Sequence, residues 1–266
     1  MQTVLITGAS SGIGAATAEH LAQEGFRVYG TSRSQRSPSP DAAGVHWLAM
    51  DVCDESSVAQ AVAQLLADTE QLDALVCNAG FGIFGSVEEV SIEAARQQFD
   101  TNYFGVLRVL RAVLPHMRER GAGRIVLVGS LAGRAPIPFQ SHYSASKAAV
   151  ESTVMALRNE VGRLGIRVSL VEPGDINTPF NEAMSWGDDE ASPYGEAIRS
   201  CEEVIRESLP KAPGPEIVAK TIAKALSAKQ PRVRYSVGPE SVMVPLGRRL
   251  LPDWATLALI RSHFKL

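Results

Sequence analysis

A glycine-rich turn near the start of the chain limits the fold more than any other feature of the sequence. An apolar segment through Ile6 runs into Gly8, Gly12 and Gly14, and an alanine-rich segment that predicts a helix then continues to Gly25. Glycines in such a turn let the backbone approach a pyrophosphate, and the unpaired N–H groups at a helix N-terminus attract negative charge. The spacing G-x-x-x-G-x-G is one residue longer in its first gap than the usual dinucleotide fingerprint. The strand–turn–helix context favours phosphate binding over a turn that serves tight packing alone.

Apolar strands and helical segments alternate after this turn, which predicts an α/β fold with a doubly wound parallel sheet. Predicted strands cover 27–31, 45–50, 73–77, 125–128, 166–171 and 232–237, and predicted helices cover 55–68, 92–120, 141–164 and 215–228. We expect the helix 92–120 to be interrupted or distorted near Pro115, because proline removes a helical N–H donor. Gly165 is expected to end the helix that precedes it.

The length of 266 residues suits one domain, so we assign residues 1–266 to a single dinucleotide-binding oxidoreductase domain. Residues 175–215 are the least regular part and contain Phe180, Met184, Trp186 and Tyr194, a composition typical of a substrate lid. The tail, 239–266, ends in a predicted amphipathic helix from Leu246 onward. Such a helix could pack on the domain, on a second subunit or on a membrane surface.

The composition excludes several classes of protein. Hydrophobic residues make up 45% and charged residues 21%, as in ordinary soluble proteins, and the net charge of -3 gives no reason to expect nucleic acid or an anionic membrane as partner. The three cysteines are odd in number and lack metal-ligand spacing. We therefore expect a cytoplasmic protein with neither a metal site nor a transmembrane segment.

The stretch from Arg124 to Lys147 combines a buried-strand pattern, a hydroxyl at the strand end and a following helix. The hydroxyl belongs to Ser130, and the helix carries Tyr143 and Lys147 four residues apart, on one face. A neighbouring ammonium favours phenolate and lowers the tyrosine pKa toward neutrality, where general acid–base catalysis is efficient. Such a trio suits proton transfer that accompanies hydride transfer.

The second predicted strand ends at Ser32 and Arg33, with Arg36 close behind. NAD enzymes usually carry an acid at this place for the ribose 2′-hydroxyl. A guanidinium can instead bind a 2′-phosphate through paired hydrogen bonds, so we expect NADP(H) as the cofactor. The alternative is a solvated surface arginine.

With these motifs in this order, the chain resembles the short-chain dehydrogenase/reductase family, in its short single-domain branch. The resemblance is carried by T-G-A-S-S-G-I-G at 7–14, N-A-G at 78–80, Asn102, Ser130, Y-S-A-S-K at 143–147 and P-G at 173–174. It implies a sheet of the Rossmann type. The segment R-Y-S-V-G at 234–238 and the long tail are similar to the hydroxysteroid and retinol dehydrogenase group.

The resemblance implies a catalytic tetrad. Tyr143 would be the general acid–base, Lys147 would lower its pKa and hold the nicotinamide ribose, Ser130 would orient the substrate oxygen, and Asn102 would hold a water that relays protons. It also implies that Asp51 and Val52 lie against adenine, and Ile176 and Thr178 against the carboxamide. The full set of expected cofactor contacts is Gly8, Ser10, Ser11, Gly12, Ile13, Gly14, Ser32, Arg33, Asp51, Val52, Asn78, Ala79, Gly80, Tyr143, Lys147, Pro173, Gly174, Ile176 and Thr178.

We therefore predict an NADP(H)-dependent oxidoreductase that acts on a small hydrophobic ketone or secondary alcohol, as a homodimer or homotetramer. Phe81, Phe84, Ile137 and Phe139, on the same edge of the sheet as the predicted lid, favour the apolar substrate, unless they and the lid aromatics serve packing. One alternative substrate class is a 3-oxoacyl thioester, although reductases of acyl carrier proteins usually end soon after the last strand. Another alternative is a catalytically idle regulator or scaffold of the same fold, against which the complete tetrad argues.

Overall fold

A parallel sheet in the expected order forms the centre of the molecule. The computed structural model describes residues 1–34, 40–69, 71–180, 185–186 and 192–266. Within them, a seven-stranded sheet has the order β3-β2-β1-β4-β6-β7-β9, and every pairing in it is parallel. The strands are β1 (Thr3–Ile6), β2 (Arg27–Ser32), β3 (Val45–Ala49), β4 (Ala74–Cys77), β6 (Gly123–Val128), β7 (Ile166–Pro173) and β9 (Arg234–Val237). This confirms the predicted doubly wound α/β fold.

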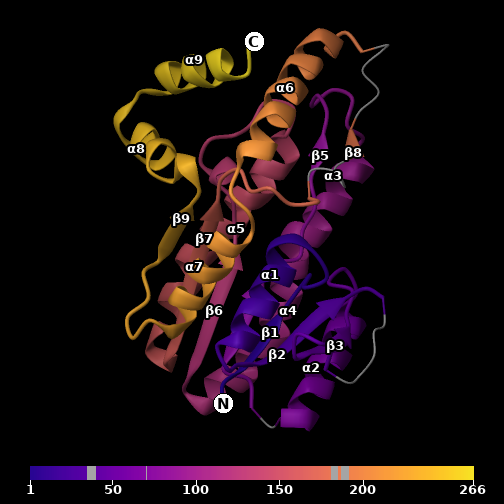
Figure 1. Ribbon diagram of the computed structural model, residues 1–266, viewed down its shortest axis with the longest axis vertical. Helices are drawn as coiled ribbons and strands as arrows, with labels where there is room; N and C mark the ends of the chain where they lie inside the picture. Colours follow the sequence, from indigo (N-terminus) through magenta and orange to yellow (C-terminus); the bar gives the residue numbers. More distant parts are fainter. Residues whose placement is uncertain (35–39, 70, 181–184, 187–191) are drawn as a thin grey trace.

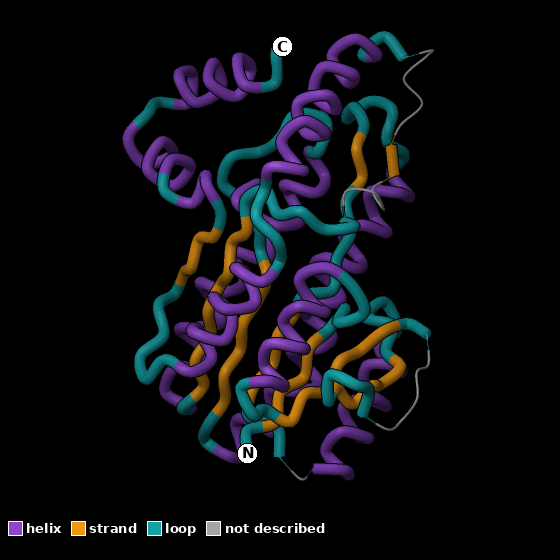
Figure 2. Tube along the Cα trace, viewed as in Figure 1, coloured by secondary structure: helices purple, strands orange, loops and turns teal. Residues whose placement is uncertain are grey.

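Alternating side chains along each strand divide the core into two layers. Val4 and Ile6 of β1 point to the face covered by α1 (Gly12–Gln23) and α7 (Glu216–Ser227). Leu5 points to the other face, which α2 (Glu55–Thr69), α4 (Gly105–Arg120) and α5 (Ser141–Val161) cover. Figure 1 shows α1 and α7 in front of the sheet, and Figure 2 shows the strands running together between the helices. A strand buried on both faces reads as an apolar run, which is why the sequence showed it clearly.

The long helix predicted for 92–120 is distorted at a different place from the expected one. The chain forms α3 (Ile92–Phe99), then a π-helical stretch at Asp100–Phe104, and then α4, which continues through Pro115. The prediction of a distortion near Pro115 was therefore wrong. Wide turns of this kind often occur at functional sites, and this one contains Asn102.

The predicted lid contains regular structure that the sequence analysis missed. A parallel two-stranded ribbon joins β5 (Ile83–Phe84) to β8 (Ser185–Trp186), and α6 (Gly195–Ser208) follows. Met184 and the side chain of Trp186 lie outside the described residues. The remaining short helices are 3-10 turns at Leu131–Gly133, Gly162–Leu164, Leu209–Lys211 and Pro239–Ser241.

The tail forms two helices where one was predicted. They are α8 (Met243–Leu250) and α9 (Asp253–His263), drawn in yellow in Figure 1. Pro252 precedes α9 directly and has no N–H to continue α8, which accounts for the break.

A buried carboxylate ties the loop after β6 to the ends of β7 and β9. Glu172 is fully buried, and Arg134 donates to both of its oxygens at 2.8 and 3.0 Å. Arg234 donates to Glu172 at 3.1 Å and also pairs with Glu151 of α5 at 2.6 Å. The four residues connect four elements next to the stretch that carries Ser130, so this network positions that stretch.

Glu172→Ala should lower the free energy of unfolding by about 3–5 kcal/mol, because removing one partner of a buried ion pair leaves uncompensated charge. Urea denaturation at neutral pH measures the change. The matched control is Glu93→Ala, whose carboxylate meets Arg96 at 3.9 Å on an exposed helix surface. That change should cost less than about 1 kcal/mol. Equal losses in the two variants would contradict the role given to Glu172.

Candidate active site

A cavity of about 1150 Å³ lies at the carboxyl edge of the sheet, where ligands of open α/β sheets bind. Most residues that the sequence analysis selected line it. They are Gly8, Ser10, Ser11, Gly12, Ile13, Ser32, Arg33, Asp51, Val52, Asn78, Ala79, Gly80, Ser130, Tyr143, Lys147, Pro173, Gly174, Ile176 and Thr178. Gly14 and Asn102 do not line the cavity and lie behind its wall.

The glycine-rich turn has a backbone that side chains would disrupt. Gly8 and Gly12 have φ angles of +64° and +52°, in the left-handed region that favours glycine. A Cβ on Gly8 would lie 2.8 Å from the Cα of Ala79. The Ser11 side chain does not cap α1. The first backbone N–H groups of that helix therefore have no hydrogen bond from this side chain and remain able to donate to a ligand. A backbone cradle with these donors fits the pyrophosphate of a dinucleotide.

Two polar residues hold this turn against the end of β4. The Thr7 hydroxyl accepts hydrogen bonds from the backbone N–H groups of Asn78 and Ala79, at 3.0 and 3.1 Å. The Asn78 amide donates to the carbonyl oxygen of Gly8 at 3.0 Å. A Cβ on Gly14 would lie 2.1 Å from that same oxygen, so Gly14 permits close packing instead of touching a ligand. The analysis of the sequence missed Thr7, whose signal was a hydroxyl residue directly before the first glycine.

The end of the cavity beside β2 and β3 has the polar groups expected around an adenosine. Arg33 is exposed at its edge, next to Ser32. Asp51 is held by its own loop, because one carboxylate oxygen accepts from the N–H of Cys53 at 2.9 Å. Arg36 lies outside the described residues.

Tyr143 is a half-buried residue whose phenol lines the cavity. It lies in the first turn of α5, and its hydroxyl is hydrogen-bonded to the Ser130 side chain. Burial raises the pKa of Tyr143 to about 12, although the bond from Ser130 acts in the opposite direction. The sequence analysis expected a lowered pKa, and this direction is a correction. At neutral pH the group is therefore a neutral proton donor.

Lys147 is buried one helical turn from Tyr143. Its ammonium donates to the carbonyl oxygen of Val128, at the end of β6, at 3.0 Å. The ammonium nitrogen lies 5.8 Å from the centroid of the Tyr143 ring. Burial lowers the pKa of Lys147 to about 8, so the group carries its charge at neutral pH but holds its proton weakly.

Asn102 connects the loop after β4 to the first turn of α5 through hydrogen bonds behind the cavity wall. Its side-chain oxygen accepts from the N–H of Phe81 at 3.0 Å, and its amide donates to the carbonyl of Phe81 at 2.9 Å. The amide also donates to the hydroxyl of Ser146 at 3.1 Å, and that hydroxyl donates to the carbonyl oxygen of Tyr143 at 2.7 Å. The π-helical stretch therefore links the loop after β4 to the turn of α5 that carries the phenol. Sequence reasoning missed Ser146, which is fully buried.

The other half of the cavity has mainly apolar walls. Phe180 lies next to the phenol, with 5.7 Å between its ring centroid and that of Tyr143. Helix α6 and the turn after it contribute Val204, Ile205 and Leu209. The tail contributes Met243, Val244, Gly247, Arg248, Leu251, Thr256, Leu259, Ile260, His263 and Phe264. The tail therefore packs over the cavity of its own chain, and its lining role was not predicted.

The predicted aromatic wall is only partly present. Phe81, Ile137 and Phe180 line the cavity. Phe84 and Phe139 pack on each other instead, with ring centroids 6.0 Å apart. Tyr194 also does not line the cavity, and its hydroxyl donates to Glu88 at 2.6 Å. These three are packing residues in the described structure.

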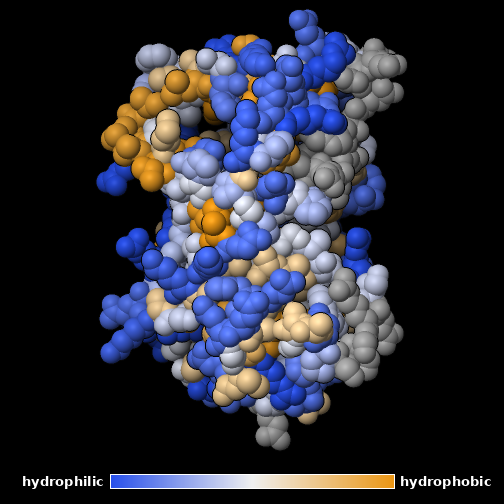
Figure 3. Space-filling view, viewed as in Figure 1, coloured by the Kyte–Doolittle hydropathy of each residue, from blue (hydrophilic) through white to orange (hydrophobic). Residues whose placement is uncertain are grey.

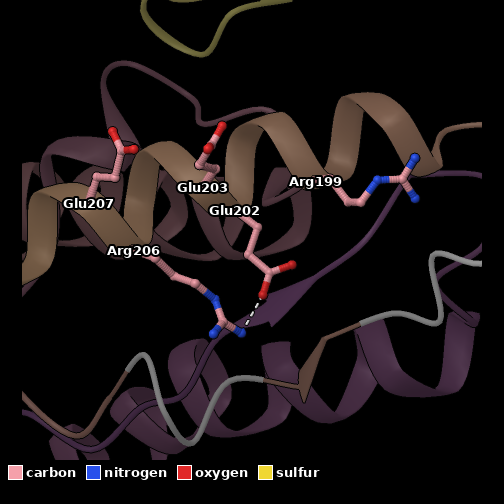
Figure 4. Close-up of a pocket in the computed structure, with 5 residues that line it drawn as sticks. All are labelled: Arg199, Glu202, Glu203, Arg206 and Glu207. Carbon is pink, nitrogen blue, oxygen red and sulfur yellow. Dashed lines mark ion pairs between the residues drawn. The ribbon is translucent and has the colours of Figure 1, made fainter.

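A second, smaller depression on the outer side of α6 contains only charged side chains. Figure 4 shows Arg199, Glu202, Glu203, Arg206 and Glu207 along this helix, with Arg206 paired to Glu202. None of the residues of the proposed catalytic tetrad lies there. Three of the four tetrad residues line the large cavity instead, which makes that cavity the candidate active site.

Comparisons with known proteins identify the family of the chain. The family model described as short chain dehydrogenase matches residues 2–188. A 3-ketodihydrosphingosine reductase of Bacteroides thetaiotaomicron is 39% identical over 255 residues, which are 95% of this chain and 94% of that protein. Estradiol 17-beta-dehydrogenase 1 of Rattus norvegicus is 36% identical over 250 residues, which are 87% of this chain and 72% of that protein.

Solved structures give the same answer for the fold. A short-chain dehydrogenase from Streptomyces avermitilis superposes with a TM-score of 0.82 at 32% identity, over 97% of both chains. A serine dehydrogenase complexed with NADP+ superposes with a TM-score of 0.78 at 27% identity, over 90% of this chain and 95% of that one. These matches confirm the predicted family and the predicted similarity to hydroxysteroid dehydrogenases. The chain belongs to the short-chain dehydrogenase family and is an oxidoreductase that acts on CH–OH or C=O groups.

Proposed function

We propose that this protein uses NADP(H) to interconvert a hydrophobic ketone and its secondary alcohol. One observation carries the proposal. The hydrogen-bonded pair of Tyr143 and Ser130 lines a cavity that has a glycine-rich, dinucleotide-fitting half on one side and an apolar half on the other. A carbonyl placed at this pair would have its carbon toward the nucleotide half and its substituents toward the apolar half.

The proton chemistry follows from the protonation states of Tyr143 and Lys147 at neutral pH. In carbonyl reduction, the nicotinamide supplies a hydride to the carbonyl carbon when it is bound. The Ser130 hydroxyl would hold the carbonyl oxygen, and the Tyr143 phenol would give that oxygen its proton. The raised pKa of Tyr143 keeps the phenol protonated at neutral pH, which supports the donor role. The Lys147 ammonium would stabilise the resulting phenolate electrostatically, and its N–H groups not used by Val128 would hold the ribose.

Contacts to the cofactor are assigned along the cavity in the same way. The turn 8–14 would hold the pyrophosphate, Arg33 the 2′-phosphate, Asp51 and Val52 the adenine, and the segment 173–178 the carboxamide. Gly12 supports the last assignment, because a Cβ built on it would lie 3.4 Å from the side chain of Thr178. The segment after β7 thus crosses to the start of α1. A proton-relaying water at Asn102, a homodimeric or homotetrameric assembly and a cytoplasmic location are also part of the proposal.

Tyr143→Phe should leave NADPH binding nearly intact and lower kcat by about 10²–10⁴, because only the acidic hydroxyl is lost. The rate of NADPH oxidation at a saturating ketone concentration gives kcat, and fluorescence titration gives the affinity for the cofactor. The matched control is Tyr29→Phe. The pKa of Tyr29 is also raised to about 12 by burial, but Tyr29 does not line the cavity. A Tyr143→Phe variant that keeps more than about a tenth of wild-type kcat would contradict the assignment of Tyr143 as the general acid.

Arg33→Ala should weaken NADPH binding about ten- to a hundredfold, since a charge-assisted contact to a phosphate is lost. NADH has no 2′-phosphate, so its KM should stay nearly unchanged. Arg163→Ala, on an exposed arginine in the turn after α5, is the control that removes the same charge elsewhere. Equal losses for the two cofactors would count against a 2′-phosphate site.

The apolar half of the cavity predicts how activity depends on substrate size. The value of kcat/KM should rise about fourfold for each methylene added to a ketone series until the apolar half is filled. Val204→Asn, inside the cavity, should reduce this rise, whereas Glu207→Gln on the outer face of the same helix should not. A flat profile, or a preference for small polar ketones, would show that the substrate class is wrong.

A further inference from the structure

The tail carries an apolar surface that its own domain leaves uncovered. Leu246 and Leu250 lie four residues apart on α8, and Trp254 and Leu257 lie three apart on α9, so each pair shares one helix face. Their exposed fractions run from 52% for Leu246 to 75% for Trp254. None of the four lines the cavity. Figure 3 shows hydrophobic residues gathered over α8 and α9, beside a hollow.

Basic side chains accompany this apolar surface. Between Met243 and Leu266 the sequence has four basic residues, Arg248, Arg249, Arg261 and Lys265, and one acidic residue, Asp253. Arg248 pairs with Asp253 at 3.0 Å. Lys265 pairs with Glu203 of α6 at 3.3 Å, whereas Arg249 and Arg261 form no ion pair within the described part of the chain. The tail is therefore positively charged although the whole chain has a net charge of -3.

The cavity opens through this same part of the molecule. Arg248, Leu251, Leu259 and His263 line the cavity and are also exposed to solvent, so one opening of the cavity lies beside the two tail helices. A second copy of the chain seated on the apolar surface would also cover this opening. A lipid surface would cover it with a phase in which apolar compounds dissolve.

We propose that α8 and α9 dock on an anionic lipid bilayer, with Leu246, Leu250, Trp254 and Leu257 inserted among the headgroups. An amphipathic helix with apolar and basic residues binds in this way, lying in the interface plane. Tryptophan and arginine are typical of that interface, and anionic lipids attract the basic side chains. This is surface binding, because none of the described helices has the length and apolar character needed to cross a membrane. Its consequence, that an apolar ketone enters the cavity directly from lipid, rests on the proposed function.

The test is flotation of the purified protein with vesicles. One set contains phosphatidylcholine alone, and the other contains phosphatidylcholine with about one third phosphatidylglycerol. Wild type should bind the second set, and more weakly at high salt. The double variant Leu246→Glu/Leu257→Glu should bind at least about tenfold more weakly, since two apolar side chains that would insert into the lipid are replaced by charges that anionic lipids repel.

The matched control is Val87→Glu/Ile92→Glu, which places the same charges on apolar residues exposed to a similar degree but outside the tail. It should bind vesicles like wild type. All three proteins should reduce a small water-soluble ketone at the same rate, and only the tail variant should lose activity on a long-chain ketone supplied in vesicles. Vesicle binding is measured without turnover, so its result stands apart from that for the proposed activity.

Two results would overturn the proposal. One is a wild-type protein that binds neither kind of vesicle. The other is a tail variant that changes a dimer to a monomer in light scattering while vesicle binding stays as in wild type, which would assign the apolar surface to a second copy of the chain.

Discussion

The burial of one ammonium group sets the conditions that the rest of the site has to meet. Removing a charge from water costs several kcal/mol, and Lys147 is held there with a hydrogen bond to the carbonyl of Val128. Burial lowers the pKa of this ammonium and raises the pKa of Tyr143. The two groups therefore hold their protons in opposite ways, the phenol tightly and the ammonium weakly. A fixed charge beside a neutral acid is an arrangement that needs little reorganisation when negative charge develops.

The parts of the structure that depend on backbone freedom could be predicted from sequence. Gly8, Gly12 and Gly165 all have positive φ angles, and each was predicted to end or turn an element. Apolar runs predicted the strands because both faces of the sheet are covered. The order of motifs predicted which residues to propose as catalytic, and the structure brings three of them, Ser130, Tyr143 and Lys147, to the lining of one cavity.

The parts that depend on contacts between distant segments could not be predicted. Pro115 reads as a helix breaker, yet the distortion lies at Asn102, whose side chain bonds to the backbone of Phe81. The pKa of Tyr143 depends on how completely other elements exclude water, which no local pattern reports. Helix α6 does have a local signal, since Ile198, Cys201 and Ile205 repeat at helical spacing. The prolines and acids around it concealed that signal.

The division of the cavity also bears on how such enzymes diverge. The nucleotide half comes from turns before residue 180, whereas α6, α8 and α9 form much of the apolar half. The family model ends at residue 188, before any of these three helices begins. Mutations in these three helices that reshape the apolar half can therefore accumulate without disturbing the sheet, the glycine-rich turn or Lys147. Helix α7 and strand β9 lie between α6 and α8 in the sequence and belong to the core, so divergence of substrate selectivity is confined to α6, α8 and α9 on either side of them.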